Sequence, residues 1–388
     1  MVRTAFVSTY PPRRCGVATF THHLALATGS REVVALHPAE QQQLPYPAEV
    51  HHRIRRDEFS DYIRIARTLE ECVDVVSIQH EYGIWGGEDG ANVVDFARAL
   101  TIPAVATLHT ILRDPTEHQR AILTELISSC EATVVMSQAA ANLLKTGYGV
   151  PPLRVNVIPY GVPDLPLVDA ETIKPGLELE GRKVLLSFGL MRPDKGYELA
   201  IAAMPAVIAA HPTALYVIVG ATHPDVLRED GEAYRESLMS RVDKLRLGKH
   251  VRFVDRFVGR VELTRWLEAA DVFVAPSPNL DRIVSGTLAY AMGAGRPVVS
   301  SPNSYASELL ADGRGVLVEP GSTATLADAL IGLLNDDAGR LAMGRHAHEF
   351  SRGMVWSEIG ARHRELFARI VEEATAPVVG RSLLAAQA

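Results

Sequence analysis

The fold is decided by the stretch Ala275-Pro-Ser-Pro-Asn-Leu-Asp-Arg-Ile-Val-Ser-Gly-Thr-Leu-Ala-Tyr-Ala-Met-Gly-Ala-Gly-Arg-Pro-Val-Val-Ser300. This stretch joins an apolar strand to a polar loop, a helix and a second strand. A strand, a crossover helix and a further strand form the repeating unit of a parallel sheet. Ser285, Gly286 and Thr287 place small side chains and free backbone amides at the start of the helix, where a phosphate group can bind. The stretch therefore predicts an α/β fold with a phosphate site at one helix N-terminus.

The same alternation extends through both halves of the chain. Short apolar, β-branched runs that predict strands occur at Thr4–Val7, Glu32–Leu36, Val73–Ile78, Ala104–Leu108, Thr133–Met136, Lys183–Gly189, Ala214–Gly220, Val251–Val254, Val272–Ala275, Pro297–Ser300 and Gly315–Val318. Amphipathic stretches of helical length lie between them. Near-continuous apolar strands separated by helices are typical of a parallel sheet that is covered on both faces.

The alternation is interrupted once, which predicts two doubly wound domains. A Pro- and Gly-containing stretch of low periodicity over residues 166–182 predicts a linker. We therefore expect one Rossmann-like domain over residues 1–165 and a second over residues 183–355. Ligands of such sheets bind beyond the carboxyl ends of the strands, so the expected site is the cleft between the two domains.

Composition excludes several classes of protein. The chain has 388 residues, 47% of them hydrophobic, and a net charge of −7, which disfavours nucleic acid as a partner. Its 3 cysteines are widely spaced and indicate neither a disulfide framework nor a metal site. No apolar run approaches the roughly 18 residues of a membrane span, and the N-terminus leads directly into a strand. We expect a cytoplasmic location and leave peripheral membrane contact open.

Three stretches of the first half carry candidate binding residues. Arg14 and Gly16 lie in the loop before the first helix, where a glycine lets a ligand approach the backbone. His80, Glu81 and Tyr82 follow the third strand, and His109 follows the fourth. Polar groups at the carboxyl ends of strands are typical of a site, although solvated turns and structural histidines remain alternatives for all three stretches.

The second half offers a pair of cations and a histidine. Arg192 and Lys195 follow the strand that starts at Lys183 and precede a helix, which suits a diphosphate. His223 lies after another strand and is a candidate cleft residue. A separate basic cluster over residues 51–56, with Arg64 and Arg67, allows either contact with anionic lipid or an ordinary solvated face.

Several common motifs are absent from the sequence. It contains no Asp-x-Asp pair, phosphate-binding P-loop, Cys/His metal cluster or nucleophile elbow, and no G-x-G-x-x-G follows the first strand. We therefore expect neither a metal nor a cofactor.

The motifs together resemble glycosyltransferase family 4, whose members are retaining enzymes of the GT-B fold. The resemblance covers about residues 3–375, and its motifs are the Gly16 loop, Thr107-Leu-His-Thr110, Ile158-Pro-Tyr-Gly-Val162, Phe188-Gly with Lys195-Gly196, Ala275-Pro-Ser277, Ala291-Met-Gly-Ala-Gly-Arg-Pro-Val-Val299 and Glu319-Pro-Gly321. The final helix, at about residues 356–375 with Trp356, resembles the last helix of the family, which crosses back onto the first domain.

The resemblance implies a role for individual residues. It implies that Gly16 lies against the phosphates of the donor, that His109 contacts the transferred sugar and that Lys195 binds the diphosphate. It also implies that Phe257 lies beside the nucleobase. The backbone of Ser285, Gly286, Thr287 and Leu288 would hold the distal phosphate.

The sequence departs from the family pattern at three positions. Leu190 stands where the family has an arginine, and Arg192 is a candidate substitute. Arg282 and Tyr290 stand where the family has two glutamates that lie near the sugar and the ribose of the donor, and Asp281 is a candidate for a displaced carboxylate. These departures leave the donor's identity open.

We expect a metal-independent, retaining hexosyltransferase that uses a nucleotide-diphospho-sugar and a hydroxyl acceptor, either a glycan, a lipid-linked glycan or a small metabolite. His109, Arg192 and Lys195 are the expected catalytic residues. Two alternatives remain at this point: a non-catalytic homologue that binds sugar nucleotides or glycans, and another enzyme of the same fold, such as a sugar-nucleotide epimerase or a phosphorylase.

Overall fold

The structure is a computed structural model that describes residues 2–38 and 44–376. The chain divides into two compact units: unit 1 comprises the chain up to Gly161 and from Trp356 onward, and unit 2 comprises Val162–Val355. Residues 166–182, expected as a linker, belong to unit 2 and hold α6 (Ala170–Ile173) and a short 3-10 helix (Lys174–Leu177). Within the described ranges, no helix combines the length and the apolar composition needed to cross a membrane.

Unit 1 is built on a parallel sheet of 7 strands in the order β3-β2-β1-β4-β5-β6-β7. Its strands are β1 (Thr4–Ser8), β2 (Glu32–His37), β3 (Val50–Arg55), β4 (Val75–His80), β5 (Ala104–Leu108), β6 (Ala132–Val135) and β7 (Val155–Val157). β1, β4 and β5 are buried along their whole length, as their continuous apolar character predicted. The order of the strands reverses between β1 and β4, and such a switch point is where α/β sheets bind ligands.

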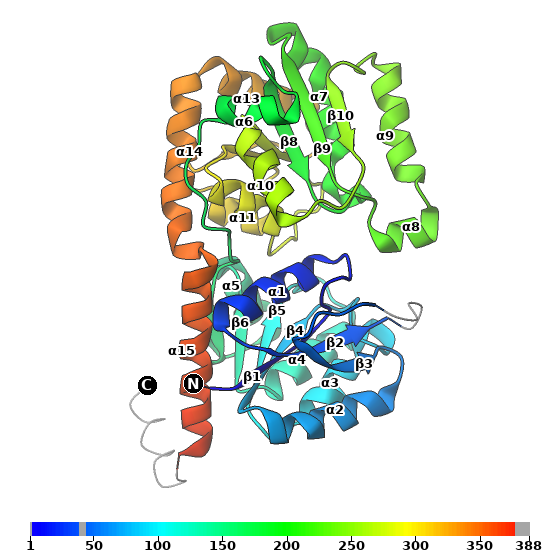
Figure 1. Cartoon of the computed structure of the whole chain (residues 1–388), viewed down its shortest axis with the longest axis vertical. Coiled ribbons are helices and arrows are strands. Elements are labelled where there is room, and N and C mark those ends of the chain that lie inside the picture. Colours follow the sequence, from blue (N-terminus) through cyan, green and yellow to red (C-terminus); the bar gives the residue numbers. More distant parts are fainter. Residues whose placement is uncertain (1, 39–43, 377–388) are drawn as a thin grey trace. The chain divides into compact units, whose positions relative to one another are not determined.

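Helices cover both faces of this sheet (Figure 1). They are α1 (Gly16–Thr28), α2 (Phe59–Cys72), α3 (Asn92–Ala99), α4 (Glu117–Ser128), α5 (Gln138–Tyr148) and α15 (Trp356–Thr375). α15 packs against α1, where a Cβ at Gly360 would lie 2.4 Å from the carbonyl oxygen of Ala27. The ring of Trp356, at the start of α15, lies 5.4 Å from that of Phe20 on α1. The last helix is therefore part of the packing of unit 1.

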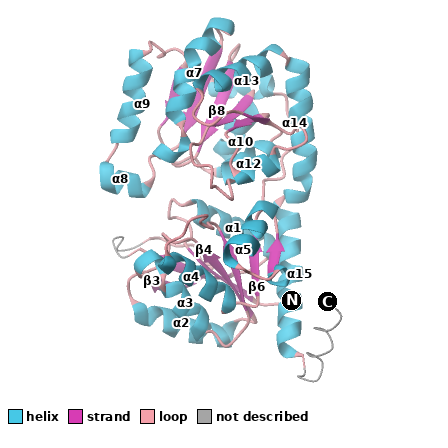
Figure 2. Cartoon of the chain, turned by 180° about the vertical axis from the view of Figure 1, so that it is seen from behind, coloured by secondary structure: helices cyan, strands magenta, loops and turns pink. Residues whose placement is uncertain are grey.

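Unit 2 repeats the architecture with 6 parallel strands in the order β10-β9-β8-β11-β12-β13. The strands are β8 (Lys183–Phe188), β9 (Ala214–Val219), β10 (Val251–Val254), β11 (Val272–Ala275), β12 (Val298–Ser300) and β13 (Val316–Leu317). Besides α6, its helices are α7 (Tyr197–Ala210), α8 (Pro224–Asp230), α9 (Ala233–Lys244), α10 (Arg260–Ala269), α11 (Gly286–Gly293), α12 (Ser304–Leu309), α13 (Thr323–Asn335) and α14 (Asp337–Ser351). Figure 2 shows helices on both sides of the strands in each unit.

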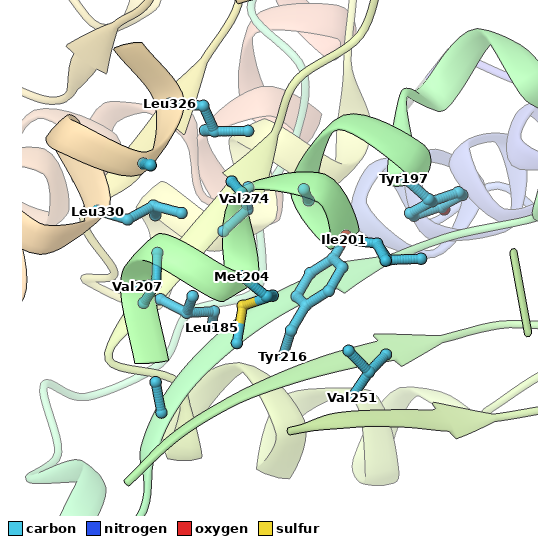
Figure 3. Packing of buried hydrophobic residues seen from close by; sticks show 14 of the residues in the cluster. Leu185, Tyr197, Ile201, Met204, Val207, Tyr216, Val251, Val274, Leu326 and Leu330 are labelled. Carbon is cyan, nitrogen blue, oxygen red and sulfur yellow. The ribbon is translucent and has the colours of Figure 1, made fainter. Parts of the chain in front are cut away.

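The core of unit 2 lies between its sheet and the pair α7 and α13. Met204 and Val207 of α7 pack over Leu185 of β8 and Tyr216 of β9, and Leu330 of α13 joins the same cluster (Figure 3). Burying one such aliphatic side chain stabilises the fold by about 1.5–3 kcal/mol. This packing fixes β8 and α7, and with them the loop that joins the two elements.

The sequence did not predict β3, β7, α8 and α12. β3 has the sequence Val-His-His-Arg-Ile-Arg, and only Ile54 of it is buried, because the strand lies at the edge of the sheet. A mostly polar edge strand lacks the apolar run by which the other strands were recognised. β7, at the opposite edge, has only 3 residues.

Candidate functional site

In unit 2 the candidate residues gather at the carboxyl ends of two neighbouring strands. β8 pairs with β11, although the two strands are far apart in the sequence. The loop after β8 carries Arg192 and Lys195, and the loop after β11 carries Arg282 and Ser285. The strand order of this sheet reverses between β8 and β11, so both loops lie at its switch point.

The turn that carries Lys195 is docked directly on the loop after β11. Gly196 has a φ of 71°, and a Cβ there would lie 2.2 Å from the carbonyl oxygen of Pro276. Only glycine therefore fits this close approach. The hydroxyl of Ser277 donates to the carbonyl oxygen of Asp194 at 2.7 Å. The backbone thus fixes the position of Lys195 relative to α11.

The two loops line a small pocket that is partly open to solvent. Its lining includes Lys195, Arg282, Ser285, Thr287 and Leu288. Arg192, the expected second cation, does not line it and is exposed. The structure thus brings Lys195 together with the start of α11, as the sequence suggested, but the arginine in the pocket is Arg282.

Arg282 and Arg192 share one carboxylate. Nη2 of Arg282 donates to Oδ2 of Asp194 at 2.6 Å. Nε of Arg192 lies 3.2 Å from Oδ1 of the same carboxylate. Three cationic side chains, counting Lys195, therefore surround a single acid, and an anion that enters the pocket would compensate the remaining positive charge.

The surroundings of Lys195 destabilise its ammonium group. Burial lowers the pKa of Lys195 to about 7, and the positive charge of Arg282 adds to this effect more than that of Arg192 does. Asp194 opposes the shift. A bound anion would favour the charged form of Lys195, so anion binding and protonation of this lysine are coupled.

The start of α11 provides backbone donors. Ser285 is the N-cap, and its hydroxyl accepts from the amide of Leu288 at 3.4 Å. Gly286 and Thr287 occupy the first turn, whose amides have no partner within a helix. α11 has no acidic residue in its first turn, so the positive end of its dipole is not neutralised there.

The remaining candidates of unit 2 lie outside the lining of this pocket. The side chain of Phe257 is 44% exposed, and Asp281 is also exposed. Tyr290 is buried within α11, in contrast to the glutamate that the resemblance would place there. The ring of His223 accepts from the amide of Asp225 and caps α8, while burial and the charge of Arg192 lower its pKa.

In unit 1, His109 is held by a neighbouring side chain that sequence reasoning missed. Nε2 of His109 lies 2.9 Å from Oε1 of Gln79. The amide nitrogen of Gln79 donates to the hydroxyl of Ser77 at 3.1 Å, which orients its oxygen toward the histidine. Nε2 must therefore carry the proton, and Nδ1 is left as an acceptor. No local sequence pattern predicts this contact, because 30 positions separate His109 from Gln79.

His109 and His80 are both neutral at physiological pH. Burial lowers the pKa of His109 to about 3, and the neighbouring His80 adds to this shift. Burial alone lowers the pKa of His80 to about 4. The backbone amide of His109 donates to the carbonyl oxygen of His80 at 3.0 Å, which joins the ends of β4 and β5. The ring of His80 is completely buried, so it packs inside unit 1 beneath the ends of these two strands.

The other candidate residues of unit 1, including Gly16, which was expected to contact the donor, lie at the same edge. Glu81 accepts from the hydroxyl of Thr110 at 2.5 Å. The Tyr82 ring packs edge-on against His80 at 4.9 Å. Gly16 is the first residue of α1 and is exposed, as is Arg14, and a Cβ at Gly16 would have no atom within 4 Å. Packing within the chain therefore does not require glycine at position 16, which leaves room for a ligand beside the helix start.

One group of side chains has the composition of a metal site. Glu88, Asp89 and His118 have ligand atoms that lie within 4.8 Å of one another. Two of the three are exposed, and Asp89 already accepts from Gln119 at 3.1 Å. The sequence analysis expected no metal, and this cluster is separate from the residues described above.

Two family models match successive parts of the chain. The model described as Glycosyltransferase Family 4 matches residues 15–164, and the model described as Glycosyl transferases group 1 matches residues 182–336. The first match lies almost entirely in unit 1 and the second lies in unit 2.

The chain is also similar to named proteins of Mycolicibacterium smegmatis and Corynebacterium glutamicum. It is 30% identical over 214 residues to a phosphatidyl-myo-inositol mannosyltransferase of Mycolicibacterium smegmatis, covering 55% of this chain and 51% of that protein. It is 27% identical over 291 residues to a D-inositol 3-phosphate glycosyltransferase of Corynebacterium glutamicum, covering 69% and 66%. The alignments thus span half to two thirds of the length of these relatives.

Solved structures share the fold across nearly the whole chain. The structure of Anabaena HepE in complex with UDP has a TM-score of 0.76 and 18% identity, covering 95% of this chain and 100% of HepE. Sucrose-phosphate synthase from Thermosynechococcus elongatus has a TM-score of 0.76 and 17% identity, covering 95% and 99%.

Proposed function

The chain belongs to glycosyltransferase family 4, and from this premise we propose that it transfers a sugar from a nucleotide-diphospho-sugar to a hydroxyl acceptor. Its fold is the GT-B fold, with one parallel α/β sheet in each of its two units. The observation that carries the proposal is the pocket of unit 2, where Lys195, Arg282 and the start of α11 converge.

The diphosphate of the donor would bind in this pocket. Lys195 and Arg282 supply positive charge, and the first turn of α11 supplies backbone N–H groups. Helix N-termini that carry small residues are suited to phosphate groups. The pocket lies at the switch point of its sheet, which is where such folds bind nucleotides.

The bond between the sugar and the phosphate would break with retention of configuration at the anomeric carbon. Positive charge then develops on the sugar, and negative charge develops on the departing diphosphate. Lys195, Arg282 and the α11 amides would stabilise the diphosphate, and removal of one such contact typically costs about 10²–10³ in rate. The acceptor hydroxyl would attack from the side of the leaving group and give its proton to the departing phosphate.

His109 would contact the transferred sugar. Its ring is neutral, and Gln79 fixes the proton on Nε2. Nδ1 would therefore accept a hydrogen bond from a sugar hydroxyl, without a change in charge during the reaction.

The residues proposed here neutralise the diphosphate with side-chain and backbone donors, so we propose that transfer does not require a metal ion.

The names of similar proteins suggest which donors to test first. HepE has been solved with UDP and with UDP-glucose, and one similar protein of Corynebacterium glutamicum is named for GDP-mannose. We propose a hexose donor with either nucleotide, and a polyol, sugar or glycan hydroxyl as the acceptor.

We also propose a cytoplasmic location, because the cysteines Cys15, Cys72 and Cys130 are free thiols, as in reducing compartments.

The test incubates the whole chain with UDP- and GDP-hexoses, labelled in the sugar, and with a panel of hydroxyl acceptors. Transfer of label with release of the nucleoside diphosphate, undiminished by a chelator, supports the proposal. Isomerised donor would indicate an epimerase, and phosphate-dependent cleavage a phosphorylase. Tight binding of donor without turnover would indicate a binding protein. Lys195→Ala should lower the rate of transfer by about 10²–10³, whereas Lys244→Ala, which removes an exposed lysine of α9, should leave it unchanged.

A further inference from the structure

Arg235 of α9 is a buried arginine that joins three segments at the carboxyl ends of β9 and β10. Its side chain is almost completely shielded from solvent. Nη2 donates to the carbonyl oxygen of Gly220 and to the hydroxyl of Thr222, both at 3.2 Å. The same nitrogen lies 2.6 Å from Oδ1 of Asp255, and Nε donates to Oε2 of Glu232 at 3.1 Å. One side chain therefore fixes the segments after β9 and β10 relative to α9.

The segment after β9 in turn holds the end of the loop that leads to Lys195. The amide of Met191 donates to the carbonyl oxygen of Ala221 at 2.8 Å. The amide of His223 donates back to the carbonyl oxygen of Met191 at 2.9 Å. The turn that carries Lys195 begins directly after Met191. Arg235 is thus connected to the start of this turn through the segment after β9.

Tyr234, the neighbour of Arg235, is connected to the other end of the same turn. Its hydroxyl donates to Oε2 of Glu198 at 2.7 Å. Glu198 lies in the first turn of α7, and α7 begins two residues after Lys195. Two adjacent residues near the start of α9 therefore hold the chain on both sides of Lys195.

The chemistry of Arg235 is not what packing alone requires. Nη1 of Arg235 is shielded from solvent and has no hydrogen-bond partner in the part of the chain that the structure describes. A buried donor without a partner lowers stability. The side chains of Glu232 and Asp255 are 40% and 56% exposed, so water would solvate both carboxylates if the arginine were replaced. An apolar side chain of similar length would therefore serve the packing of α9 about as well.

We propose that Arg235 and Tyr234 are positioning residues of the donor pocket, which hold the two ends of the Lys195 turn. This inference rests on the proposed transfer, in which Lys195 binds the diphosphate. Neither Arg235 nor Tyr234 lines the pocket, so both act through Lys195. The loop after β11 holds the turn from the other side, through Ser277. Without α9 the turn would be fixed on that side only, and a misplacement of about 1 Å can cost up to about 10² in rate.

The test asks whether the two residues act through Lys195. Arg235→Met and Tyr234→Phe are each made in the wild-type chain and in Lys195→Ala. Arg241→Met, which removes an exposed arginine of the same helix, is the matched control in both backgrounds. The affinity for UDP or GDP, whichever binds, is followed by phosphorus NMR, which also measures weak binding. Thermal unfolding of every variant is recorded in parallel.

In the wild-type background we expect Arg235→Met to weaken nucleotide binding by about tenfold and Tyr234→Phe by about threefold. In the Lys195→Ala background both changes should stay within about twofold, because the residue through which they act is absent. Arg241→Met should stay within about twofold in both backgrounds. Arg235→Met should lower the melting temperature by no more than about 4 °C.

The pH profile gives a second readout. Burial lowers the pKa of Lys195 to about 7. A turn that is less firmly held would let water reach Lys195, so in Arg235→Met the pH above which affinity falls should move upward. A loss of global stability alone would not move this break.

The inference would be overturned by unchanged affinity in both variants. It would also be overturned by an equal loss in the wild-type and Lys195→Ala backgrounds, which would assign the residues a general structural role. If Arg235→Met does not fold, Tyr234→Phe decides the question, since it removes a single hydroxyl. A wild-type chain that binds nucleotide but transfers no sugar would contradict the proposed function alone, whereas a chain that binds neither nucleotide would contradict both.

Discussion

Nη2 of Arg282 lies 2.6 Å from Oδ2 of Asp194, although 88 positions of the sequence separate the two residues. The pair connects the loop after β11 to the turn that carries Lys195. It also places a guanidinium in the pocket at a position where the family resemblance implies a glutamate. Arg282 is therefore the arginine that lines the pocket together with Lys195. Arg192 is exposed and contacts the carboxylate of Asp194 without lining the pocket.

The first prediction compares how much Arg282 and Arg192 contribute to binding of the nucleoside diphosphate. Arg282→Gln should weaken binding of the nucleoside diphosphate by about tenfold or more, since a hydrogen bond to a charged group contributes about 1.5–3 kcal/mol. Arg192→Gln should weaken it by no more than about threefold, as expected for an exposed charge. Calorimetry at pH 6.5, where Lys195 is mostly protonated, measures both. Equal losses for the two variants would contradict the assignment of Arg282.

A second prediction concerns pH. Burial and the charge of Arg282 lower the pKa of Lys195 to about 7, and an anion binds the protonated form better. The dissociation constant for the nucleoside diphosphate should therefore be nearly constant below pH 7 and should rise above it, by up to about tenfold per pH unit. In Arg282→Gln the pKa of Lys195 rises, so the break should move to higher pH. A flat profile between pH 6.5 and 8.5 would contradict this coupling.

Gln79 provides the third prediction, as a positioning residue. The pKa of His109 is about 3, so turnover of the wild-type enzyme should show no histidine inflection between pH 5.5 and 8. Gln79→Glu places a carboxylate beside Nε2, which raises the pKa of His109 and should introduce such an inflection. Gln79→Leu should lower kcat about tenfold and leave nucleotide affinity unchanged. Wild-type kinetics in both variants would show that this contact does not position His109.

The fourth prediction concerns the stability of unit 2. Asp271 is buried, lies 2.9 Å from Nζ of the buried Lys174 and accepts from the backbone amide of Val184 at 2.6 Å. Asp271→Ala would leave the Lys174 charge paired only with the exposed Glu171. We expect a loss of about 3–5 kcal/mol in the free energy of unfolding, measured by denaturant titration. Asp328→Ala, which removes an exposed carboxylate from α13, should change stability by less than about 0.5 kcal/mol.

The fold could be predicted from sequence because its central strands are continuous apolar runs. Val272–Ala275 and the run from Lys183 correspond to β11 and β8, and both lie in the parallel sheet that the alternation predicted. β3 escaped prediction because only one of its side chains is buried, so its Arg53 was grouped with Arg55 as one basic cluster. In the structure the two arginines have different partners: Arg55 pairs with Asp61, whereas Arg53 lies over the ring of Tyr46.

The site was predictable only where its residues are adjacent in sequence. Ser285–Thr287 at the start of α11 follow a local pattern of helix N-termini that bind phosphate. The choice of Arg282 over Arg192 depends on the pairing of β8 with β11, which no local pattern encodes. The contact between His109 and Gln79 likewise depends on the register of β4 and β5, in which Gln79 lies opposite Thr107.

The central claim is that a diphosphate binds beside Lys195 and the start of α11. Its most direct test is the affinity of UDP and GDP for the wild-type chain, Lys195→Ala and Lys244→Ala, measured by calorimetry at pH 6.5. The account predicts that at least one of the two nucleotides binds, that Lys195→Ala weakens this binding at least thirtyfold and that Lys244→Ala leaves it unchanged. An affinity that is the same in Lys195→Ala as in the wild type would contradict it.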